Sequence, residues 1–277
     1  MRNIKFRLWF KKRKIMQISG ICVGTGINGQ YIINAEGRDW EGVITWIYEK
    51  KLSRSSLDDF MIMQYTGLKD INDKEIFEGD ILKSKNLKGY GVVEYVEDKS
   101  CFMVKSPMND NCFMGDLDNI EILGNIYKNP ELLKETKKEK NKREIKFRVF
   151  DKKRKRILTD GICVGFGMNG YYIIDADDRD LEGDITWIYG ENFVRIPLDN
   201  FIVMQNTGLK DVNGKEIFEG DIVKSQNMSN NGVVEYIEDK ACFMVKESMT
   251  ESHFMWDLND IEVIGNVCEN PELKEQK

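Results

Sequence analysis

Residues 64–83 read QYTGLKDINDKEIFEGDILK, and residues 205–224 read QNTGLKDVNGKEIFEGDIVK. The repeat extends outward from this block: residues 2–132 align with residues 143–273 at a constant offset of 141, without a gap. Of these 131 aligned pairs, 79 are identical. Because an internal repeat usually reflects a repeated structural unit, the sequence predicts one domain present twice.

The aligned lengths define the domain organisation. Copy one spans residues 1–130 and copy two residues 143–277, each close to the common domain size of roughly 100–150 residues. Copy one ends at Asn129-Pro130, where Asn suits a helix cap and Pro the first helical position. We therefore expect a short helix from Pro130. It runs into residues 131–142, a charged stretch without an apolar stripe, which we interpret as an exposed, partly helical linker.

The hydrophobic pattern inside each copy has mostly a period of two, which indicates β-strands. In copy one the predicted strands are residues 4–8, 43–48, 60–64, 81–83, 91–96, 101–105 and 120–123. A hairpin turn is expected at residues 97–100. The predicted class is therefore mainly all-β, with a small barrel or a strongly bent sheet in each copy. We expect the copies to pack as a pseudo-symmetric pair that replaces a homodimer contact.

Composition limits the compartment. No apolar run approaches the roughly 20 residues needed to cross a bilayer, and the N-terminus lacks the apolar stretch of a signal peptide. The six cysteines favour buried reduced thiols and hence a cytoplasmic protein, although a Cys22–Cys101 disulfide stays open. With one histidine and no Cys-x-x-Cys, no metal site is predicted.

Charge is distributed unevenly between the copies. Residues 1–130 carry 19 basic and 18 acidic side chains, whereas residues 143–271 carry 15 and 24, which gives net charges of +1 and −9. Sequence differences also cluster, at residues 15–19, 49–56, 85–90 and 106–112, which are the expected loops. Two nearly identical scaffolds thus present different electrostatic fields. Such a difference affects the binding of partners more than it affects the fold.

The order of three motifs carries a family resemblance. They are Ile4-Lys5-Phe6-Arg7, the block at residues 64–83, and the closing stretch Ile122 to Asn125 with Asn129-Pro130-Glu131-Leu132. Together, and twice over, they resemble the YopX family of small phage and prophage proteins. The tandem fusion departs from that family, whose members are usually single. The resemblance implies a β-rich fold, a phage origin and an intracellular setting, and it implies no activity.

The repeated acidic residues are more typical of turns than of a calcium site or a catalytic site. Asp211-Val212-Asn213-Gly214 is typical of a tight turn, and as a calcium loop it lacks a closing Glu and has Lys215 at the next ligand position. Asp80 and Asp221 each lie in a polar turn near a lysine, so we interpret them as structural rather than catalytic. His253 is matched by Cys112, so a histidine mechanism cannot operate in both copies.

Two further motifs have a structural interpretation. Residues 24–29 read GTGING, which matches a Gly-x-Gly-x-x-Gly fingerprint, but a strand follows instead of the helix that binds phosphate. We therefore predict a glycine hairpin. The basic runs at residues 11–14 and 152–156 are expected to be solvated hairpin tips, and the acidic second copy argues against direct DNA binding.

Tryptophans and arginines supply the candidate binding residues. Trp46 and Trp187, in matching strands, are expected in the core. Trp40 and Trp256 have no tryptophan counterpart, since Leu181 and Gly115 stand at those positions. Copy-specific aromatic residues are frequent at interfaces, so we expect Trp40 and Trp256 to contact a partner or the other copy.

The leading hypothesis is a non-catalytic phage accessory protein without a cofactor. It would act in the host cytoplasm by binding and inhibiting a host protein, such as a defence or nucleic-acid-handling factor. The first alternative is a sponge for a small anionic, nucleotide-like ligand. Its candidate residues are Arg7, Arg38, Arg148 and Arg179, with Trp46 or Trp187. A hydrolase or nuclease that uses Asp80 and Asp221 is the second alternative, and self-association into a homo-oligomer stays open.

Overall fold

The computed structural model describes most of both copies. The described residues are 3–18, 20–26, 29–38, 44–47, 60–107, 111–133, 143–159, 161–167, 170–179, 185–189 and 200–275. Within these ranges the chain forms β-strands joined by short 3₁₀ helices, which confirms the all-β class. None of the helices in the described part of the chain is long and apolar enough to cross a membrane.

Matching strands arise at matching positions of the two copies. The strands of copy one are β1 (Phe6–Phe10), β2 (Ile15–Gln17), β3 (Ile21–Gly26), β4 (Gly29–Arg38), β5 (Ile44–Ile47), β6 (Phe60–Lys69), β7 (Glu75–Phe77), β8 (Asp80–Lys83), β9 (Gly91–Val96), β10 (Cys101–Lys105), β11 (Cys112–Phe113) and β12 (Glu121–Asn125). Those of copy two are β13 (Phe147–Asp151), β14 (Arg156–Leu158), β15 (Ile162–Gly167), β16 (Gly170–Arg179), β17 (Ile185–Tyr189), β18 (Phe201–Lys210), β19 (Glu216–Phe218), β20 (Asp221–Lys224), β21 (Gly232–Ile237), β22 (Cys242–Lys246), β23 (Ser252–Phe254) and β24 (Glu262–Asn266).

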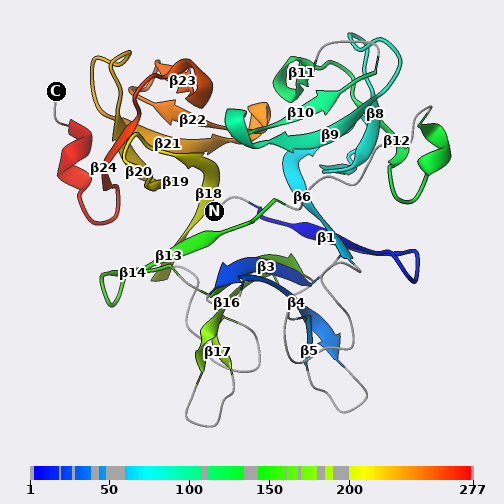
Figure 1. The fold of residues 1–277 in the computed structure, drawn as a ribbon, viewed down its shortest axis with the longest axis horizontal. Coiled ribbons are helices and arrows are strands. Elements are labelled where there is room, and N and C mark those ends of the chain that lie inside the picture. The colour runs from blue at the N-terminus through cyan, green and yellow to red at the C-terminus, as the bar shows by residue number, and fades with distance from the viewer. Residues whose placement is uncertain are drawn as a thin grey trace.

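The strands build four sheets, two of which pass from one copy into the other (Figure 1). Each copy has its own four-stranded sheet, in the orders β2-β1-β6-β7 and β14-β13-β18-β19. A six-stranded sheet runs β17-β16-β15-β3-β4-β5, and a ten-stranded sheet runs β12-β8-β9-β10-β22-β21-β20-β24. The copies therefore join through backbone pairing at two places.

The lower interface is the pairing of β3 with β15; β3 lies just below β1 in Figure 1. Its antiparallel register places Val23 opposite Val164, which are equivalent residues, so the pseudo-twofold axis passes between them. A Cβ atom on Gly24 would lie 2.0 Å from the carbonyl oxygen of Ile162, and one on Gly165 would lie 2.1 Å from that of Ile21. Glycine is therefore required here by the close approach of the other copy.

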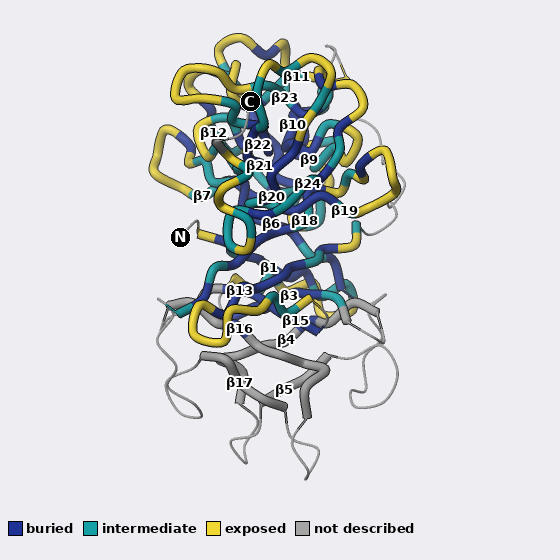
Figure 2. The backbone as a smooth tube through the Cα atoms, turned by 90° about the vertical axis from the view of Figure 1, so that its left-hand side faces the viewer, coloured by how far each residue is buried: buried dark blue, intermediate teal, exposed yellow. Residues whose placement is uncertain are grey.

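A shared hydrophobic core lies against this interface, and its buried backbone runs through the waist of the molecule (Figure 2). Its buried members come from both copies: Ile4, Phe6, Leu8, Ile21, Val23, Ile32 and Phe60 from copy one, and Ile145, Phe147, Val149, Ile162, Val164, Ile173, Phe201 and Val203 from copy two. The rings of Phe6 and Phe147 meet edge-on, with 6.4 Å between centroids. Neither copy encloses this core alone.

The upper interface is the pairing of β10 with β22, where Cys101 lies opposite its equivalent Cys242. Two backbone hydrogen bonds flank the cysteines: Phe102 N–H donates to the oxygen of Ala241, and Phe243 N–H donates to that of Ser100, both at 2.9 Å. Tyr95 Oη also donates to the Thr207 oxygen at 2.7 Å. Between the two interfaces, the side-chain amides of Gln64 and Gln205 hydrogen-bond each other reciprocally at 3.0 and 3.1 Å.

The structure confirms the predicted hairpins. β3 and β4 pair down to Gly26 and Gly29, so the GTGING stretch is a hairpin and not a dinucleotide fingerprint. The basic run at residues 11–14 connects paired strands β1 and β2, and the run at residues 152–156 lies at the matching β13–β14 reversal. All five side chains of residues 152–156 are exposed.

The short helix at Pro130 differs from expectation in one respect. It is a single 3₁₀ turn, η4 (Pro130–Leu132), and Asn129 forms no side-chain cap on it. Instead, Asn129 Oδ1 accepts a hydrogen bond from the backbone N–H of Asn125 at 3.3 Å, which closes the preceding turn. The predicted charged linker lies mostly outside the described residues, because its segment 134–142 is not described.

Candidate functional site

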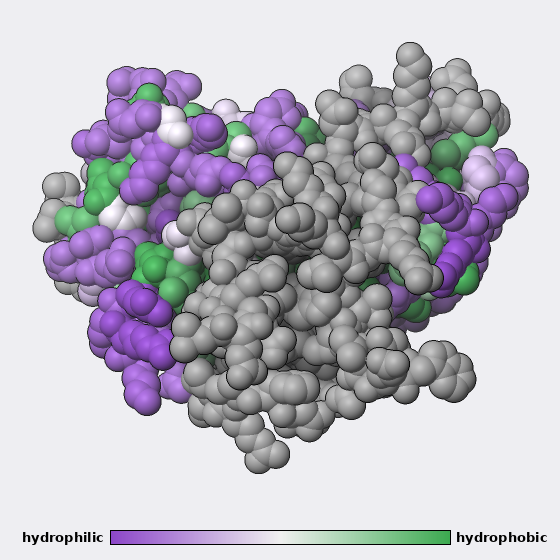
Figure 3. All heavy atoms as spheres, turned by 60° about the horizontal axis from the view of Figure 1, so that its bottom comes forward, coloured by the Kyte–Doolittle hydropathy of each residue, from purple (hydrophilic) through white to green (hydrophobic). Residues whose placement is uncertain are grey.

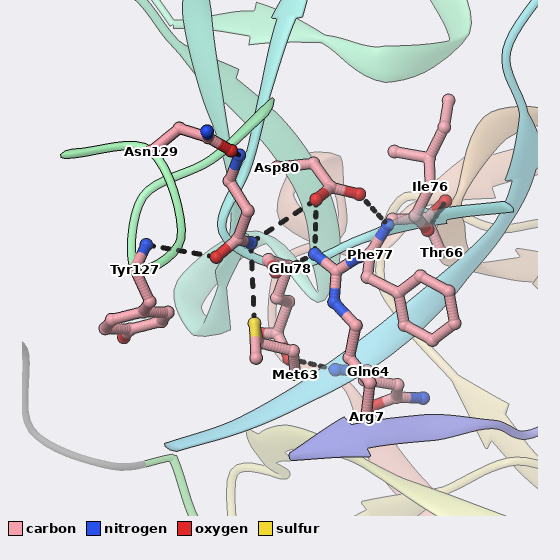
Figure 4. A network of polar contacts seen from close by, with 11 residues as sticks. Arg7, Met63, Gln64, Thr66, Ile76, Phe77, Glu78, Asp80, Tyr127 and Asn129 are labelled. Carbon is pink, nitrogen blue, oxygen red and sulfur yellow. Dashed lines mark hydrogen bonds and ion pairs between the residues drawn. The ribbon is translucent and has the colours of Figure 1, made fainter. Parts of the chain in front are cut away.

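The repeated block encloses a buried ion pair, which is drawn in Figure 4. Arg7 pairs with Asp80 Oδ1, and only 2% of the Asp80 side chain is exposed. Asp80 Oδ2 accepts the backbone N–H of Phe77 at 2.9 Å, and Asn125 Nδ2 lies 3.3 Å from Oδ1. The guanidinium of Arg7 also lies 4.6 Å from the ring centroid of Phe77. Burial raises the pKa of Asp80, although Arg7 and the N–H donors oppose that change.

Copy two repeats this network with the same partners. Arg148 pairs with Asp221, whose Oδ2 accepts the N–H of Phe218 at 2.8 Å, and the guanidinium lies 4.6 Å from the Phe218 ring. Arg7 and Arg148, which the ligand hypothesis needed as anion-binding groups, thus hold the β6–β8 and β18–β20 reversals together. Asp80 and Asp221 are committed in the same way, and we assign all four a structural role.

Asp70 and Asp211 organise the turns that follow β6 and β18. Asp70 Oδ1 accepts the N–H groups of Asn72 and Lys74 at 2.8 and 3.0 Å, and Oδ2 accepts that of Ile122 at 3.3 Å. Asp211 makes the equivalent bonds at 2.8, 2.9 and 3.1 Å. Burial acts to raise the pKa of each carboxyl, but these donors outweigh it and leave the pKa below the ordinary value. Gly214 has φ +81° and Asp73 has φ +64°, which confirms the turn interpretation.

Five of the eight candidate binding residues cannot be placed by their side chains. Arg38 and Arg179 end β4 and β16, and Trp46 and Trp187 lie in β5 and β17. The side chains of these four residues lie outside the described part of the structure, as does the whole of Trp40. Their predicted roles stay predictions.

Trp256 is the candidate that the structure places at the upper interface. It lies in η7 (Met255–Asp257), where its indole stacks on Phe254 with 4.3 Å between centroids and 14° between planes. From copy one, Phe113 meets the indole edge-on at 6.0 Å, and Lys99 Nζ lies 5.7 Å from the ring centroid. Trp256 therefore contacts the other copy, and its predicted role in binding stays a prediction.

A cleft of about 290 Å³ opens beside this indole. Six of its lining residues are Lys99, Met103, Asn111, Cys112 and Phe113 from copy one and Trp256 from copy two. Beneath it lies a cluster that includes the buried Cys101, Met103, Cys242 and Met244. Its walls combine apolar, amide and cationic groups, which suits a site that binds a mixed surface rather than one that cleaves a bond.

The cleft consists in part of positions where the copies differ. Asn111, Cys112 and Trp256 correspond to Ser252, His253 and Gly115 in the other copy. A Cβ atom on Gly115 would lie 3.3 Å from the Cα atom of Lys240, so copy one packs its η3 turn (Met114–Asp116) tightly there. Copy two instead places an indole between η7 and the turn of Lys99. The pseudo-twofold symmetry is therefore broken at this point.

The other side of η3 carries a second open cleft, of about 270 Å³. It is lined by Leu68, Ile71 and Gly115 of copy one and by Asp239 of copy two, among others. Ile71 is 58% exposed, and its equivalent Val212 is 56% exposed. Both clefts thus use residues from each copy.

The loops around the upper interface are built with different chemistry in each copy. In copy two, Glu247 Oε1 accepts the N–H groups of Ser229 and Asn230 at 2.9 and 2.7 Å, and Oε2 lies 2.8 Å from His253 Nε2. Burial acts to raise the pKa of Glu247, but His253 and these donors hold this pKa below its ordinary value. Ser106 replaces Glu247 in copy one, and its hydroxyl lies 3.5 Å from the Lys88 oxygen. The divergent loops are therefore two separately stabilised designs.

The described surface is mixed in the view of Figure 3. Its coloured part, to either side of the grey atoms, shows hydrophilic side chains over much of its area, with hydrophobic ones between them. The basic hairpin tips are part of the exposed surface.

The fold and the cleft together define a tandem-duplicated β protein whose two copies share sheets, a core and a candidate binding site. The chain belongs to the YopX family: the model of the YopX protein matches residues 5–134 and again residues 146–275. This confirms the two-copy interpretation.

Two solved structures are similar to the chain. Protein EF1440 from Enterococcus faecalis has 27% identity and a TM-score of 0.35, and the match covers 48% of this chain and 100% of that one. Protein yopX from Bacillus subtilis has 22% identity and a TM-score of 0.33, with 47% and 96% covered. No curated protein matches the chain.

Proposed function

We propose that the protein is a non-catalytic binding protein that acts in the cytoplasm of a bacterial host. Its partner would be a host protein, such as a defence or nucleic-acid-handling factor, which it inhibits. We place the contact at the cleft beside Trp256. The net charge of −9 in residues 143–271 suits competition for a basic, nucleic-acid-binding surface on that partner.

One observation carries this proposal: the asymmetric cleft at an otherwise symmetric interface. The scaffold positions repeat, whereas Trp256 faces Gly115 and the loops around the cleft differ. A half-buried tryptophan that lines a mixed apolar and polar cleft is a common energetic anchor of protein interfaces. Asp80, Asp221, Arg7 and Arg148 pair with one another inside the fold, which favours this proposal over hydrolysis or an anion sponge that uses these four residues.

The test uses the whole chain as bait in lysate from infected host cells. Trp256→Gly, which gives copy two the residue of copy one, is the comparison bait. Ile18→Thr is the matched control, because it makes the same kind of copy-to-copy exchange at an exposed position of 65% accessibility away from the cleft. The partner recovered by the unaltered chain is then purified, and its Kd for each variant is measured by calorimetry.

The proposal expects Trp256→Gly to weaken binding by roughly 30-fold, the loss typical of an interface hot spot. Ile18→Thr should leave the Kd unchanged. Equal Kd values for the unaltered chain and Trp256→Gly would remove the cleft from the interface. Recovery of no partner by the unaltered chain, or turnover of a substrate, would contradict the binding function itself.

A further inference from the structure

We propose that Cys101 and Cys242 are a site of intramolecular disulfide formation, which joins the two copies covalently when the protein meets a small disulfide oxidant. This inference concerns the thiols under the cleft and is independent of any partner. Both cysteines are reduced in the structure, and both are fully buried.

The strand register carries the inference. Cys101 and Cys242 are direct partners of the antiparallel β10–β22 pairing. The flanking hydrogen bonds run from Phe102 to Ala241 and from Phe243 to Ser100, so the cysteines themselves form a non-hydrogen-bonded pair. Such pairs have Cα atoms about 4.5 Å apart with side chains on one face. A disulfide needs a Cα separation of roughly 4.4–6.8 Å, so the backbone need not move far.

The surroundings place both thiols in one cluster. They lie with Met103 and Met244 under the aromatic residues Phe113, Phe254 and Trp256. Burial raises the pKa of each thiol to about 12, so the thiols are protonated and react slowly at neutral pH. Because these aromatic residues pack against the thiols, we expect an oxidant to reach them faster when this cover opens. This makes the reaction rate a measure of how firmly that cover is closed.

The chemical step is two successive thiol–disulfide exchanges. One cysteine loses its proton, and its sulfur attacks the oxidant disulfide; a mixed disulfide forms and one thiol of the oxidant leaves. The second cysteine loses its proton and attacks the mixed disulfide on the protein sulfur, which releases the second thiol. The protein gives up two electrons and two hydrogens, and the oxidant becomes two thiols.

The other cysteines supply internal comparisons. Cys22 and Cys163 are equivalent residues on the paired strands β3 and β15, and both are fully buried. In this pairing, however, Cys22 lies opposite Gly165 and Cys163 lies opposite Gly24. Diagonal neighbours of this kind have Cα atoms roughly 7–8 Å apart, which is too far for a disulfide without backbone movement. Cys112 and Cys268 are half-buried and belong to different clusters.

The experiment uses the full chain with Cys112→Ser and Cys268→Ser, so that only the four buried thiols remain. The protein is incubated with 2,2′-dipyridyl disulfide under native conditions, and the released thiopyridone is followed by absorbance. Intact mass and peptide mapping identify the product. Three variants in the same background accompany it: Cys101→Ser, Cys22→Ser, and Trp256→Ala, which thins the aromatic cover.

The proposal expects a product two hydrogens lighter, with a peptide that links residues 101 and 242 and two thiopyridones released per chain. Cys22→Ser should react in the same way, and Trp256→Ala should react at least several-fold faster. Cys101→Ser should give no internal cross-link. A linkage of Cys22 to Cys163, mixed disulfides alone, or four unreacted thiols after Trp256→Ala has been treated would each overturn the proposal. If Cys101→Ser fails to fold, the mapped peptide of the unsubstituted pair decides alone.

Discussion

The lower and upper interfaces lie on the same pseudo-twofold axis but are built differently. At the lower one, β3 and β15 pair over four register positions, and the shared core draws on matching positions of both copies. At the upper one, β10 and β22 share a single register position, and the neighbouring Trp256 has Gly115 as its equivalent. Symmetric packing thus accompanies extensive backbone pairing, and asymmetry appears where the pairing is minimal.

This difference separates two roles. The lower interface leaves little freedom, because a glycine faces a carbonyl oxygen at a distance that excludes any side chain. The upper interface has space, since the strands diverge and a cleft opens between the copies. A duplicated chain can change one half of such a cleft without changing the other, which a homodimer cannot do. The predictions below test this division, beginning with the largest effect.

Gly24→Ala should have the largest effect. The new Cβ would lie 2.0 Å from the Ile162 oxygen, so β3 and β15 must separate and expose the shared core. We expect a loss of unfolding free energy above about 4 kcal/mol, or failure to fold. Urea denaturation measures it.

Gly214→Asp is the matched control for Gly24→Ala. It introduces the residue found at Asp73, where φ is +64°, and no atom lies within 4 Å of the new Cβ. The expected cost is about 1 kcal/mol or less. Equal costs for the two glycine substitutions would show that strand contact between the copies is not what the fold depends on.

Asp80→Ala and Asp221→Ala should come next, at about 3–5 kcal/mol each. Each leaves a buried arginine without its partner, and the effect should be similar in the two copies because the networks match. Thermal denaturation with and without added phosphate checks this. If phosphate raised the Tm of the unaltered chain by binding at Arg7 and Arg148, the structural role of these residues would be wrong.

The sequence predicted the class, the duplication and most strands because each depends on local pattern. Glycine at residues 24 and 165 was assigned to a hairpin, which is correct but incomplete: the tight contact with the other copy leaves no local signal. Arg7 and Arg148 were considered ligand residues because their buried partners lie 73 positions away along the chain. Trp256 could be identified because the internal alignment showed an aromatic residue opposite a glycine. What the proposed cleft binds has no signature in the sequence.

Low pH should lower the unfolding free energy by protonating Asp70 and Asp211. The pKa of each carboxyl is lower in the folded state than its ordinary value. Each ionised carboxylate therefore contributes its full stability above the ordinary pKa, and this stability is lost as pH falls through the folded pKa. The double variant Asp70→Asn, Asp211→Asn should lose about 2 kcal/mol at pH 7 and less at pH 3. Unfolding free energies at both pH values measure this. A loss that is the same at both values would refute the ionised-turn interpretation.

Trp256→Gly should have a smaller effect on stability than the Asp80 and Asp221 substitutions, about 1–2 kcal/mol, because the indole is only half-buried. Gly115→Trp is the reverse exchange, and it should cost more because the turn of Lys240 leaves no space there. Urea denaturation of both variants compares the two sides of the axis. Equal costs would mean that the upper interface is symmetric after all.

The account's central claim is that the two copies form one folding unit. Differential scanning calorimetry of the full chain tests it most directly, because the van't Hoff enthalpy reports the size of the cooperative unit. With a shared core and shared sheets, we predict a single transition whose calorimetric and van't Hoff enthalpies agree. Two transitions, or a calorimetric enthalpy near twice the van't Hoff value, would show that the copies unfold independently and would contradict the claim.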